Sequence, residues 1–402
     1  MNKPKGSLLW LLGWAGMLTP LAIDMYLPAM PSMAVSLAVA EHWIQLSLSL
    51  FVAGFALGQL LLGPLSDSFG RKPFMLIGML GFALSSLLIA FSSSVESLLF
   101  WRLIQGLFAA GPAVLIAAIL RDQVQQNEFA RMMSLVTLVL VLAPLVAPLL
   151  GTLVILLWQD WHWIFMVLAV NAFICLLVMA WLLPESLSKD KRQPLNLSAS
   201  FADFGQLLTT MGSLKYILLG SLPFASMFIF LTLGSFVYIG HFGLSELQFS
   251  LLFAANVLAL MLMTWINSRL VRRFGAKQML TFGLWAQLGL GLIMLLGALL
   301  AGYLIGGVLW LAVPLALFVG MVSFIGANAL ACLYEQTKVM PGTVASLAGA
   351  SRFALGGVIG LLVSLLAVQG PSVMALAMLC CPLASLLILY LLPERQLRAQ
   401  NA

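Results

Sequence analysis

Charged side chains are scarce in this 402-residue chain, at 8% of the residues against 62% hydrophobic residues. A soluble domain of this size needs much more polar surface to cover its core, so a soluble globular fold is excluded. The mean hydropathy of +1.10 points the same way. The composition instead indicates an all-α membrane protein that crosses the bilayer many times.

Cysteine and histidine are also few, with 4 and 3 residues. The cysteines lie in or beside apolar spans, and no pair shares an outward loop, so we predict neither disulfides nor a structural zinc site. The histidines lie at outer loops or helix ends without fellow ligands, which predicts interfacial residues and no metal site. We also find no acid pair, nucleophile and base at catalytic spacing, or filter-like loop, so we predict neither an enzyme nor a channel and no cofactor. The residues concerned are Cys175, Cys332, Cys380, Cys381, His42, His162 and His241.

Apolar spans of about 20 residues, the length that crosses a bilayer, recur along the chain. The first is longer than the apolar core of a signal peptide, so we expect it to be retained as a helix. The tenth is long enough to contain a break. We expect the twelve spans at 7–30, 43–64, 74–92, 98–120, 132–157, 162–183, 215–240, 247–268, 278–300, 303–333, 343–368 and 371–392.

Positive charge is distributed unevenly between the loops. Of the 19 Lys and Arg residues, only Arg102 and Arg352 lie well inside spans, and the other 17 fall in, or at the edge of, every second loop or tail. An even number of spans puts both termini on one side, and the positive-inside rule makes that side the cytoplasm. The pI of 9.3 therefore reflects these loops, and nucleic-acid binding is not predicted.

The longest polar stretch divides the spans into two sets of six. We predict an N-terminal six-helix bundle over 1–185, a cytoplasmic linker over 186–214, and a C-terminal six-helix bundle with a short tail over 215–402. A weak internal sequence similarity relates residues 66–72, after the second span, to residues 271–277, after the eighth. Many transporters build two halves around a midplane site from parallel repeats of this kind.

A short turn after the second span carries both acid and base. Its sequence is Gly63-Pro64-Leu65-Ser66-Asp67-Ser68-Phe69-Gly70-Arg71-Lys72-Pro73. Glycines permit a tight backbone, and the charges can form a partly buried ionic latch between helix ends. This run resembles the pattern between helices 2 and 3 of the major facilitator superfamily, although Ser68 stands where that family usually has a basic residue. The alternative is a positive-inside anchor alone. We assign to the latch Gly63, Asp67, Gly70, Arg71, Lys72 and, from the end of the fourth span, Asp122.

Asp24 and Arg102 are charged residues inside apolar spans. A carboxylate at this depth costs a few kcal/mol unless it is paired or protonated. Counted along each helix, Asp24 lies roughly 9 Å and Arg102 roughly 8 Å from the outer boundary, so the two side chains can meet at one level. A proton on Asp24 would break the pair and its loss would restore it, because arginine does not titrate. The alternative is a purely structural pair.

The residues after Arg102 extend this pattern. Gln105, at i+3, shares its helix face and can orient the guanidinium or a substrate, or form an ordinary interhelical hydrogen bond. The run from Leu99 to Gly106 resembles the fourth-helix motif of drug:proton antiporters of the superfamily, in which the arginine is implicated in proton handling.

The fifth span combines small residues with prolines on one face. Ala143-Pro144, Ala147-Pro148 and Gly151 suit close packing and a bend. The run is similar to the antiporter motif of helix 5, with alanines in place of glycines. Simple helix packing is the alternative for Pro144, Pro148 and Gly151.

Arg352 lies roughly 15 Å deep in the eleventh span. It should face the cavity or an acid, and an anionic or carbonyl-rich substrate would suit it, whereas backbone carbonyls could satisfy it equally. The amides Asn171, Asn256 and Asn328 are either substrate ligands or interhelical contacts. Our substrate-binding candidates are Tyr26, Gln105, Asn256, Asn328 and Arg352.

Together these segments resemble the Bcr/CflA branch of the 12-helix drug:proton antiporters, from the first span to the eleventh. Arg352 matches a residue typical of that branch, whereas His162 stands where it often has arginine. The resemblance implies the major facilitator fold, a monomer in the bacterial inner membrane, and export of small amphipathic drugs in exchange for protons. Export of a metabolite such as a purine nucleoside or an amino acid stays open as the alternative.

Overall fold

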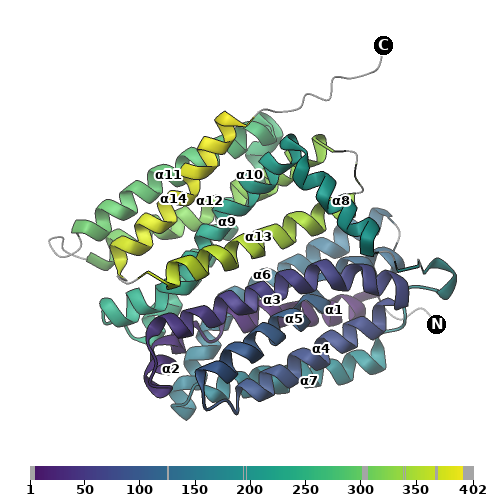
Figure 1. The fold of residues 1–402 in the computed structure, drawn as a ribbon, viewed down its shortest axis with the longest axis horizontal. Helices are drawn as coiled ribbons and strands as arrows, with labels where there is room; N and C mark the ends of the chain where they lie inside the picture. Colours follow the sequence, from purple (N-terminus) through teal and green to yellow (C-terminus); the bar gives the residue numbers. More distant parts are fainter. Residues whose placement is uncertain are drawn as a thin grey trace. The chain divides into compact units, whose positions relative to one another are not determined.

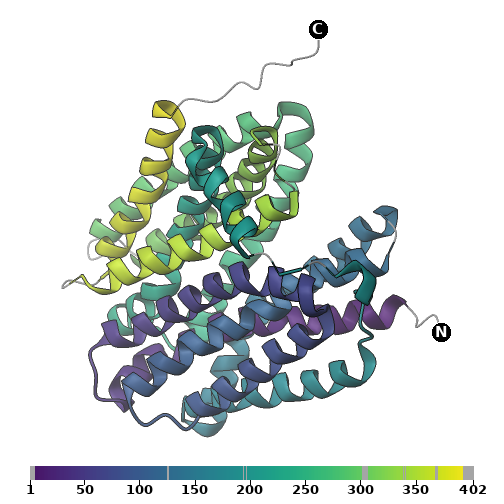
Figure 2. The same cartoon turned by 45° about the vertical axis from the view of Figure 1, so that its right-hand side comes forward.

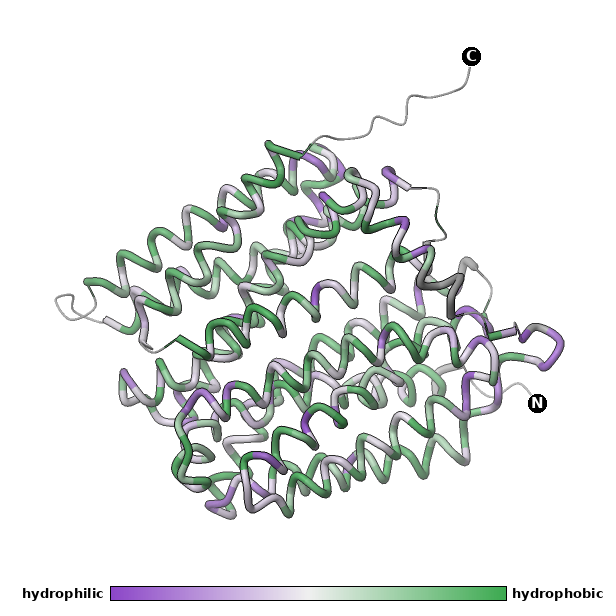
Figure 3. The backbone as a smooth tube through the Cα atoms, viewed as in Figure 1, coloured by the Kyte–Doolittle hydropathy of each residue, from purple (hydrophilic) through white to green (hydrophobic). Residues whose placement is uncertain are grey.

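The computed structural model of the chain describes residues 5–124, 126–192, 194–195, 197–300, 307–337, 339, 341–366 and 370–392. Within these residues the secondary structure is helical throughout, without strands (Figure 1). Twelve helices are long and apolar enough to cross a membrane, and Figure 3 shows hydrophobic colouring along most of their length. The predicted fold class, an all-α protein with twelve spans, is confirmed.

The chain divides into two compact units. Unit 1 comprises Met1–Leu197 together with Glu246–Ser250, and unit 2 comprises Ser198–Ser245 and Leu251–Ala402. The helices of unit 1 are α1 (Lys5–Asp24), η1 (Leu27–Ala29), α2 (Met30–Ser36), α3 (Glu41–Phe69), α4 (Arg71–Ile89), α5 (Val95–Gln123), α6 (Gln126–Trp158), α7 (His162–Leu182) and η2 (Lys189–Lys191). The remaining helices are α8 (Leu197–Thr209), α9 (Met211–Ser235), η3 (Phe236–His241), α10 (Glu246–Phe274), α11 (Ala276–Leu300), α12 (Gly307–Glu335), α13 (Pro341–Ser364) and α14 (Pro371–Leu391).

The first span is broken, which its hydropathy did not reveal. Helix α1 ends at Asp24, Met25 and Tyr26 form a turn, and the span continues through η1 and α2 to Ser36. Pro28 and Pro31, at the starts of η1 and α2, lack the backbone N–H that a continuous α-helix would need. Asp24 therefore lies at a helix end, beside backbone groups that regular helical bonding does not use.

The tenth span, which is long enough to contain a break, shows none in its described part. Helix α12 runs without interruption from Gly307 to Glu335, although Pro314 lies within it. Hydropathy detects the length of an apolar span but does not locate a kink.

Helices α3 and α5 pack backbone to backbone (Figures 1 and 2). A Cβ at Gly54 or Gly58 would overlap the carbonyl oxygen of Leu103 or Leu107, and one at Gly106 would overlap that of Phe51. Small residues permit this approach, and dispersion contacts along it stabilise helix pairs in a membrane. We call these three residues the glycine seam. It holds the face of α5 that carries Arg102 against α3.

Unit 2 is organised around α9, which packs against α12, α13 and α14. Its side chains are buried on nearly all sides, including Phe228, Phe230 and Leu233. An all-round apolar helix of this kind belongs to the interior of a bundle.

Candidate proton-coupling site

Arg102 is the largest fully buried side chain of unit 1, with an exposed fraction of 0%. Its Nη1 donates hydrogen bonds to the carbonyl oxygen of Ala22, at 3.0 Å, and to Oε1 of Gln105, at 2.7 Å. Its Cζ lies 4.4 Å from the ring centre of Tyr26 and 4.5 Å from that of Phe51. Helix α5 thus carries a cation into the bundle, where aromatic faces partly replace its hydration.

One edge of this guanidinium has no well-aligned acceptor, although the hydroxyl of Tyr26 lies close to the guanidinium. No described residue lies at hydrogen-bond geometry to Nε or Nη2, although both atoms are buried. These are the two nitrogens that present parallel N–H groups to a carboxylate. Since a buried donor without an acceptor is unfavourable by about 1–3 kcal/mol, this edge is prepared for an oxygen ligand.

The expected ion pair between Asp24 and Arg102 is absent from the structure, where no nitrogen of Arg102 lies within 4 Å of the Asp24 carboxylate. Arg102 instead contacts Ala22 and Tyr26, the residues two positions before and after Asp24. Ala22 makes its contact through the backbone carbonyl, and Tyr26 lies in the turn after α1, so neither contact brings the side chain of Asp24, which is rotated away, onto the guanidinium. Counting depth along the span predicted the level of Asp24 but not this rotation. Asp24 is nevertheless buried, with an exposed fraction of 5%.

Gln105 and Tyr26, both substrate-binding candidates, are fully engaged inside unit 1. Gln105 accepts from Arg102 and donates through Nε2 to Oγ of Ser86, at 2.7 Å. Tyr26 has an exposed fraction of 0%, and its hydroxyl lies 3.3 Å from Oγ of Ser47. In this conformation both residues position Arg102, and neither presents a free polar edge to a ligand.

Gly151 brings α6 to the break in the first span. A Cβ at this position would overlap the carbonyl oxygen of Met25, the residue that follows Asp24. Pro144 and Pro148 lie within the same helix, about two turns and one turn earlier, respectively. The motif predicted on the fifth span therefore contacts the segment that carries the candidate coupling acid.

The predicted latch residues gather where α3 meets α4. Arg71 forms an ion pair with Asp67, and its Nε lies 3.3 Å from Oδ2 of Asp122. Its Nη1 donates to Oγ of Ser66 at 2.6 Å. The side chain of Lys72 forms no ion pair among the described residues and donates instead to the carbonyl oxygen of Ala180, at 2.8 Å. Gly63 lies one turn before Asp67. A Cβ at this position would make only an ordinary contact, 3.8 Å from Cγ1 of Val114, so the packing does not require glycine here.

Glu185 completes this cluster and was missed by sequence reasoning. Its carboxylate accepts the backbone N–H groups of Arg71, at 2.9 Å, and Lys72, at 3.3 Å, which are the first of α4. It thereby neutralises the positive end of that helix. Gly70 has φ +111°, and a Cβ there would lie 2.5 Å from Oε2 of Glu185. In the sequence, the only indication of this contact was that Glu185 is an acidic residue just after the sixth span.

The candidates in unit 2 do not form one site. Nδ2 of Asn328 donates to Oδ1 of Asn267, at 2.9 Å, so this amide joins α12 to α10. Nη2 of Arg352 donates to the carbonyl oxygen of Gly326, at 2.7 Å, and the guanidinium also lies beside Gly220. Asn256 is buried, with an exposed fraction of 5%. Arg352 is half-buried and keeps most of its donors, which makes it the candidate best able to bind a ligand.

Twelve apolar spans with charged residues buried inside them define a polytopic membrane protein, and comparison with known proteins gives its family. The sequence profile of the Major Facilitator Superfamily matches residues 12–361, so the chain belongs to that family. It is therefore a transporter and no enzyme.

Similar proteins of known or curated description show where in the superfamily the chain belongs. The chain is 36% identical over 405 residues to a bicyclomycin resistance protein homolog of Haemophilus influenzae, covering 100% of both chains. It is 28% identical to the multidrug transporter MdfA of Edwardsiella ictaluri, covering 81% of this chain and 78% of that one. These matches confirm the resemblance to the Bcr/CflA drug-resistance branch. A D-xylose–proton symporter of known structure has a TM-score of 0.74 at 15% identity, covering 96% and 98% of the two chains, which shows the shared fold.

Proposed function

We propose that this protein exports small amphipathic compounds across the bacterial inner membrane in exchange for protons. The observation that carries the proposal is the unfilled Nε–Nη2 edge of Arg102, buried beside the segment that holds Asp24. The names of the relatives, which mention bicyclomycin resistance and multidrug transport, support the substrate class.

Asp24 supplies the titrating group in this proposal. When it is ionised, its carboxylate accepts two parallel hydrogen bonds from the free edge of Arg102. When it takes up a proton, it becomes neutral and leaves the guanidinium, which keeps its charge and its bonds to Ala22 and Gln105. One proton therefore exchanges an ion pair for a buried neutral acid, which is a large local change in electrostatic free energy. In this proposal, a conformation without the ion pair belongs to the protonated form.

The break in the first span allows the movement that this exchange requires. Met25 and Tyr26 separate α1 from η1, so a rotation at this turn can carry Asp24 toward Arg102. Gly151 of α6 lies against the same turn and transmits the rotation to a second helix. In the proposal, the latch of Asp67, Arg71 and Asp122 then opens and closes with the cytoplasmic end of unit 1.

The orientation follows from the positive charges. The latch carries Arg71 and Lys72, so the positive-inside rule assigns its loop to the cytoplasm. The same rule assigns both termini to that side. We propose that the protein works as a monomer, since each chain carries its own coupling residues. Arg352 is the proposed substrate contact in unit 2, because its remaining donors suit a carbonyl-rich or anionic edge.

Transport into inverted membrane vesicles tests the proposal. With an imposed pH gradient, wild-type vesicles should accumulate a phenicol or bicyclomycin, whereas Asp24→Asn vesicles should not. Asp203→Asn is the matched control, because Asp203 is an exposed acid in helix α8. Accumulation by Asp24→Asn at the wild-type rate would refute the coupling role. Accumulation of purine nucleosides or amino acids, without any drug, would refute the substrate class alone.

A further inference from the structure

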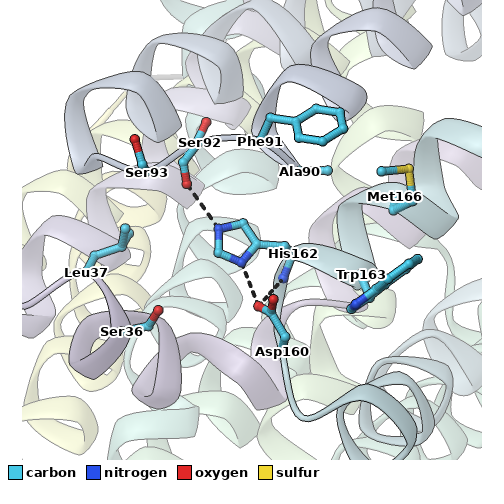
Figure 4. A pocket seen from close by; sticks show the side chains of 10 residues that line it. All are labelled: Ser36, Leu37, Ala90, Phe91, Ser92, Ser93, Asp160, His162, Trp163 and Met166. Carbon is cyan, nitrogen blue, oxygen red and sulfur yellow. Dashed lines mark hydrogen bonds and ion pairs between the residues drawn. The ribbon is translucent and has the colours of Figure 1, made fainter.

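A second titratable cluster lies at the opposite end of unit 1 from the latch. Helix α4 begins at Arg71, in the latch, and ends at Ile89, and its 19 residues span about 28 Å. Beyond it, residues 90–94 form the loop to α5, which faces the start of α7. Between them is a hollow with a volume of about 570 Å³, shown in Figure 4.

His162 bridges the two segments that border this hollow. Its Nδ1 lies 2.6 Å from Oδ1 of Asp160, and its Nε2 lies 3.0 Å from the backbone carbonyl oxygen of Ser92 (Figure 4). The backbone N–H of His162 donates to the same carboxylate oxygen, at 3.1 Å. The indole of Trp161 stacks on the imidazole, with ring centres 3.7 Å apart.

Only one form of the ring can complete both of these hydrogen bonds. A carbonyl oxygen and a carboxylate oxygen only accept hydrogen bonds, so both imidazole nitrogens must donate. Only the imidazolium has two N–H groups. A neutral ring would turn one lone pair toward an oxygen at 2.6 or 3.0 Å, which is repulsive. Turning the ring over does not help, because carbon atoms would then face both oxygens.

The surroundings keep Asp160 available as the charged partner. Burial alone would raise its pKa, but the hydrogen bonds from the backbone and ring of His162, and the charge of that ring, lower the pKa below its usual value. Among the described residues lining the hollow, Asp160 and His162 alone titrate. Helix α2, the 90–94 loop and α7 contribute only neutral side chains, namely Ser36, Leu37, Ala90, Phe91, Ser92, Ser93, Trp163 and Met166.

We propose that His162 is a proton-binding site that ties the 90–94 loop to the start of α7. Proton uptake gives the ring both donors and closes the bridge between Asp160 and Ser92. Proton loss leaves one donor, which stays with the carboxylate because a charge-assisted bond is stronger, and the Ser92 carbonyl is released. Because the imidazolium has two N–H donors and the neutral ring has one, the bridge responds to the pH on the side opposite the latch. This role is separate from that of Asp24.

Hydrogen exchange on the full-length protein in nanodiscs tests the proposal. After correction for intrinsic rates, the peptide covering 90–95 should exchange about tenfold faster at pH 8 than at pH 5.5, equivalent to about 1.4 kcal/mol. His162→Gln should abolish this step, because its amide does not titrate. His162→Arg should keep the loop protected at both pH values, because arginine stays charged.

The controls separate this site from others. Two variants should keep the difference in exchange rate between pH 5.5 and pH 8. His42→Gln removes a histidine of α3 elsewhere in unit 1, and Asp24→Asn removes the proposed coupling acid. Nitrogen NMR of the imidazole should show both nitrogens of His162 protonated at pH 5.5. A wild-type loop equally protected at both pH values, or a His162→Gln protein that keeps the step, would overturn the proposal.

Discussion

Replacement of Gly151 by alanine tests the contact between α6 and the break in the first span. A Cβ at this position would lie well inside the 3.0 Å that real Cβ contacts respect, and its neighbour is the backbone oxygen of Met25. A backbone atom cannot swing away as a side chain can, so the two segments must separate. Overpacking of this kind destabilises by about 1–3 kcal/mol.

A matched substitution isolates that contribution. Alanine favours a helix over glycine by about 1 kcal/mol at either position, so this gain must be subtracted. Gly289→Ala in α11 provides the reference, because nothing lies within 4 Å of its added Cβ. We expect the free energy of unfolding of Gly151→Ala to fall below that of Gly289→Ala by about 1–3 kcal/mol.

The assay is reversible unfolding in mixed detergent micelles, with drug accumulation in vesicles measured in parallel. Gly151→Ala should lose transport together with stability, because the displaced segment carries Asp24 and Tyr26. Equal stability and equal transport for the two alanine variants would show that α6 does not hold the break, and the proposed transmission from Asp24 to α6 would fail.

Other substitutions probe the remaining contacts. Glu185→Gln should lower the free energy of unfolding by about 0.5–1 kcal/mol, measured by the same unfolding titration, since it removes the charge at the N-terminus of α4. A double-mutant cycle of Asn328→Ala and Asn267→Ala should give a coupling energy of about 0.6 kcal/mol, whereas additive effects would argue against the interhelical bond. Because the pKa of Asp160 is lowered in the folded protein, its contribution to stability is complete above the usual aspartate value of about 3.9 and is lost as the pH falls through the lowered pKa. The stability difference between wild type and Asp160→Asn should accordingly shrink between pH 5 and the most acidic pH at which the protein can be measured. Arg102→Lys should abolish transport despite conserving charge, because an ammonium cannot bond Ala22 and Gln105 and still present two parallel donors.

The spans were predictable because hydropathy and length are properties of the sequence alone. Each of the twelve predicted spans has its counterpart within a few residues of the predicted bounds. The burial of Arg102 was predictable for the same reason, since its neighbours along the chain are apolar. The break after Asp24 was not, because Pro28 and Pro31 are also compatible with a bent but continuous helix.

Contacts between helices were harder to predict, because they depend on how each helix is rotated. The depth of Asp24 matched that of Arg102, yet the guanidinium bonds the carbonyl oxygen of Ala22, a group that every residue possesses. Asn328 was one of several intramembrane amides, and only the fold selects Asn267 as its partner. Glu185 lies 114 positions from Arg71 in the sequence, and no local pattern links the two.

The glycine seam restricts how unit 1 can change shape. The backbones of α3 and α5 are in contact at Gly54, Gly58 and Gly106. The two helices therefore cannot slide or roll past one another without a carbonyl oxygen of one helix colliding with the backbone of the other. The two helices must travel as a single rigid body through any transport cycle. A change of shape in unit 1 therefore has to occur at contacts other than the glycine seam, and evolution toward new cargo can vary the other helices while leaving the fused pair untouched.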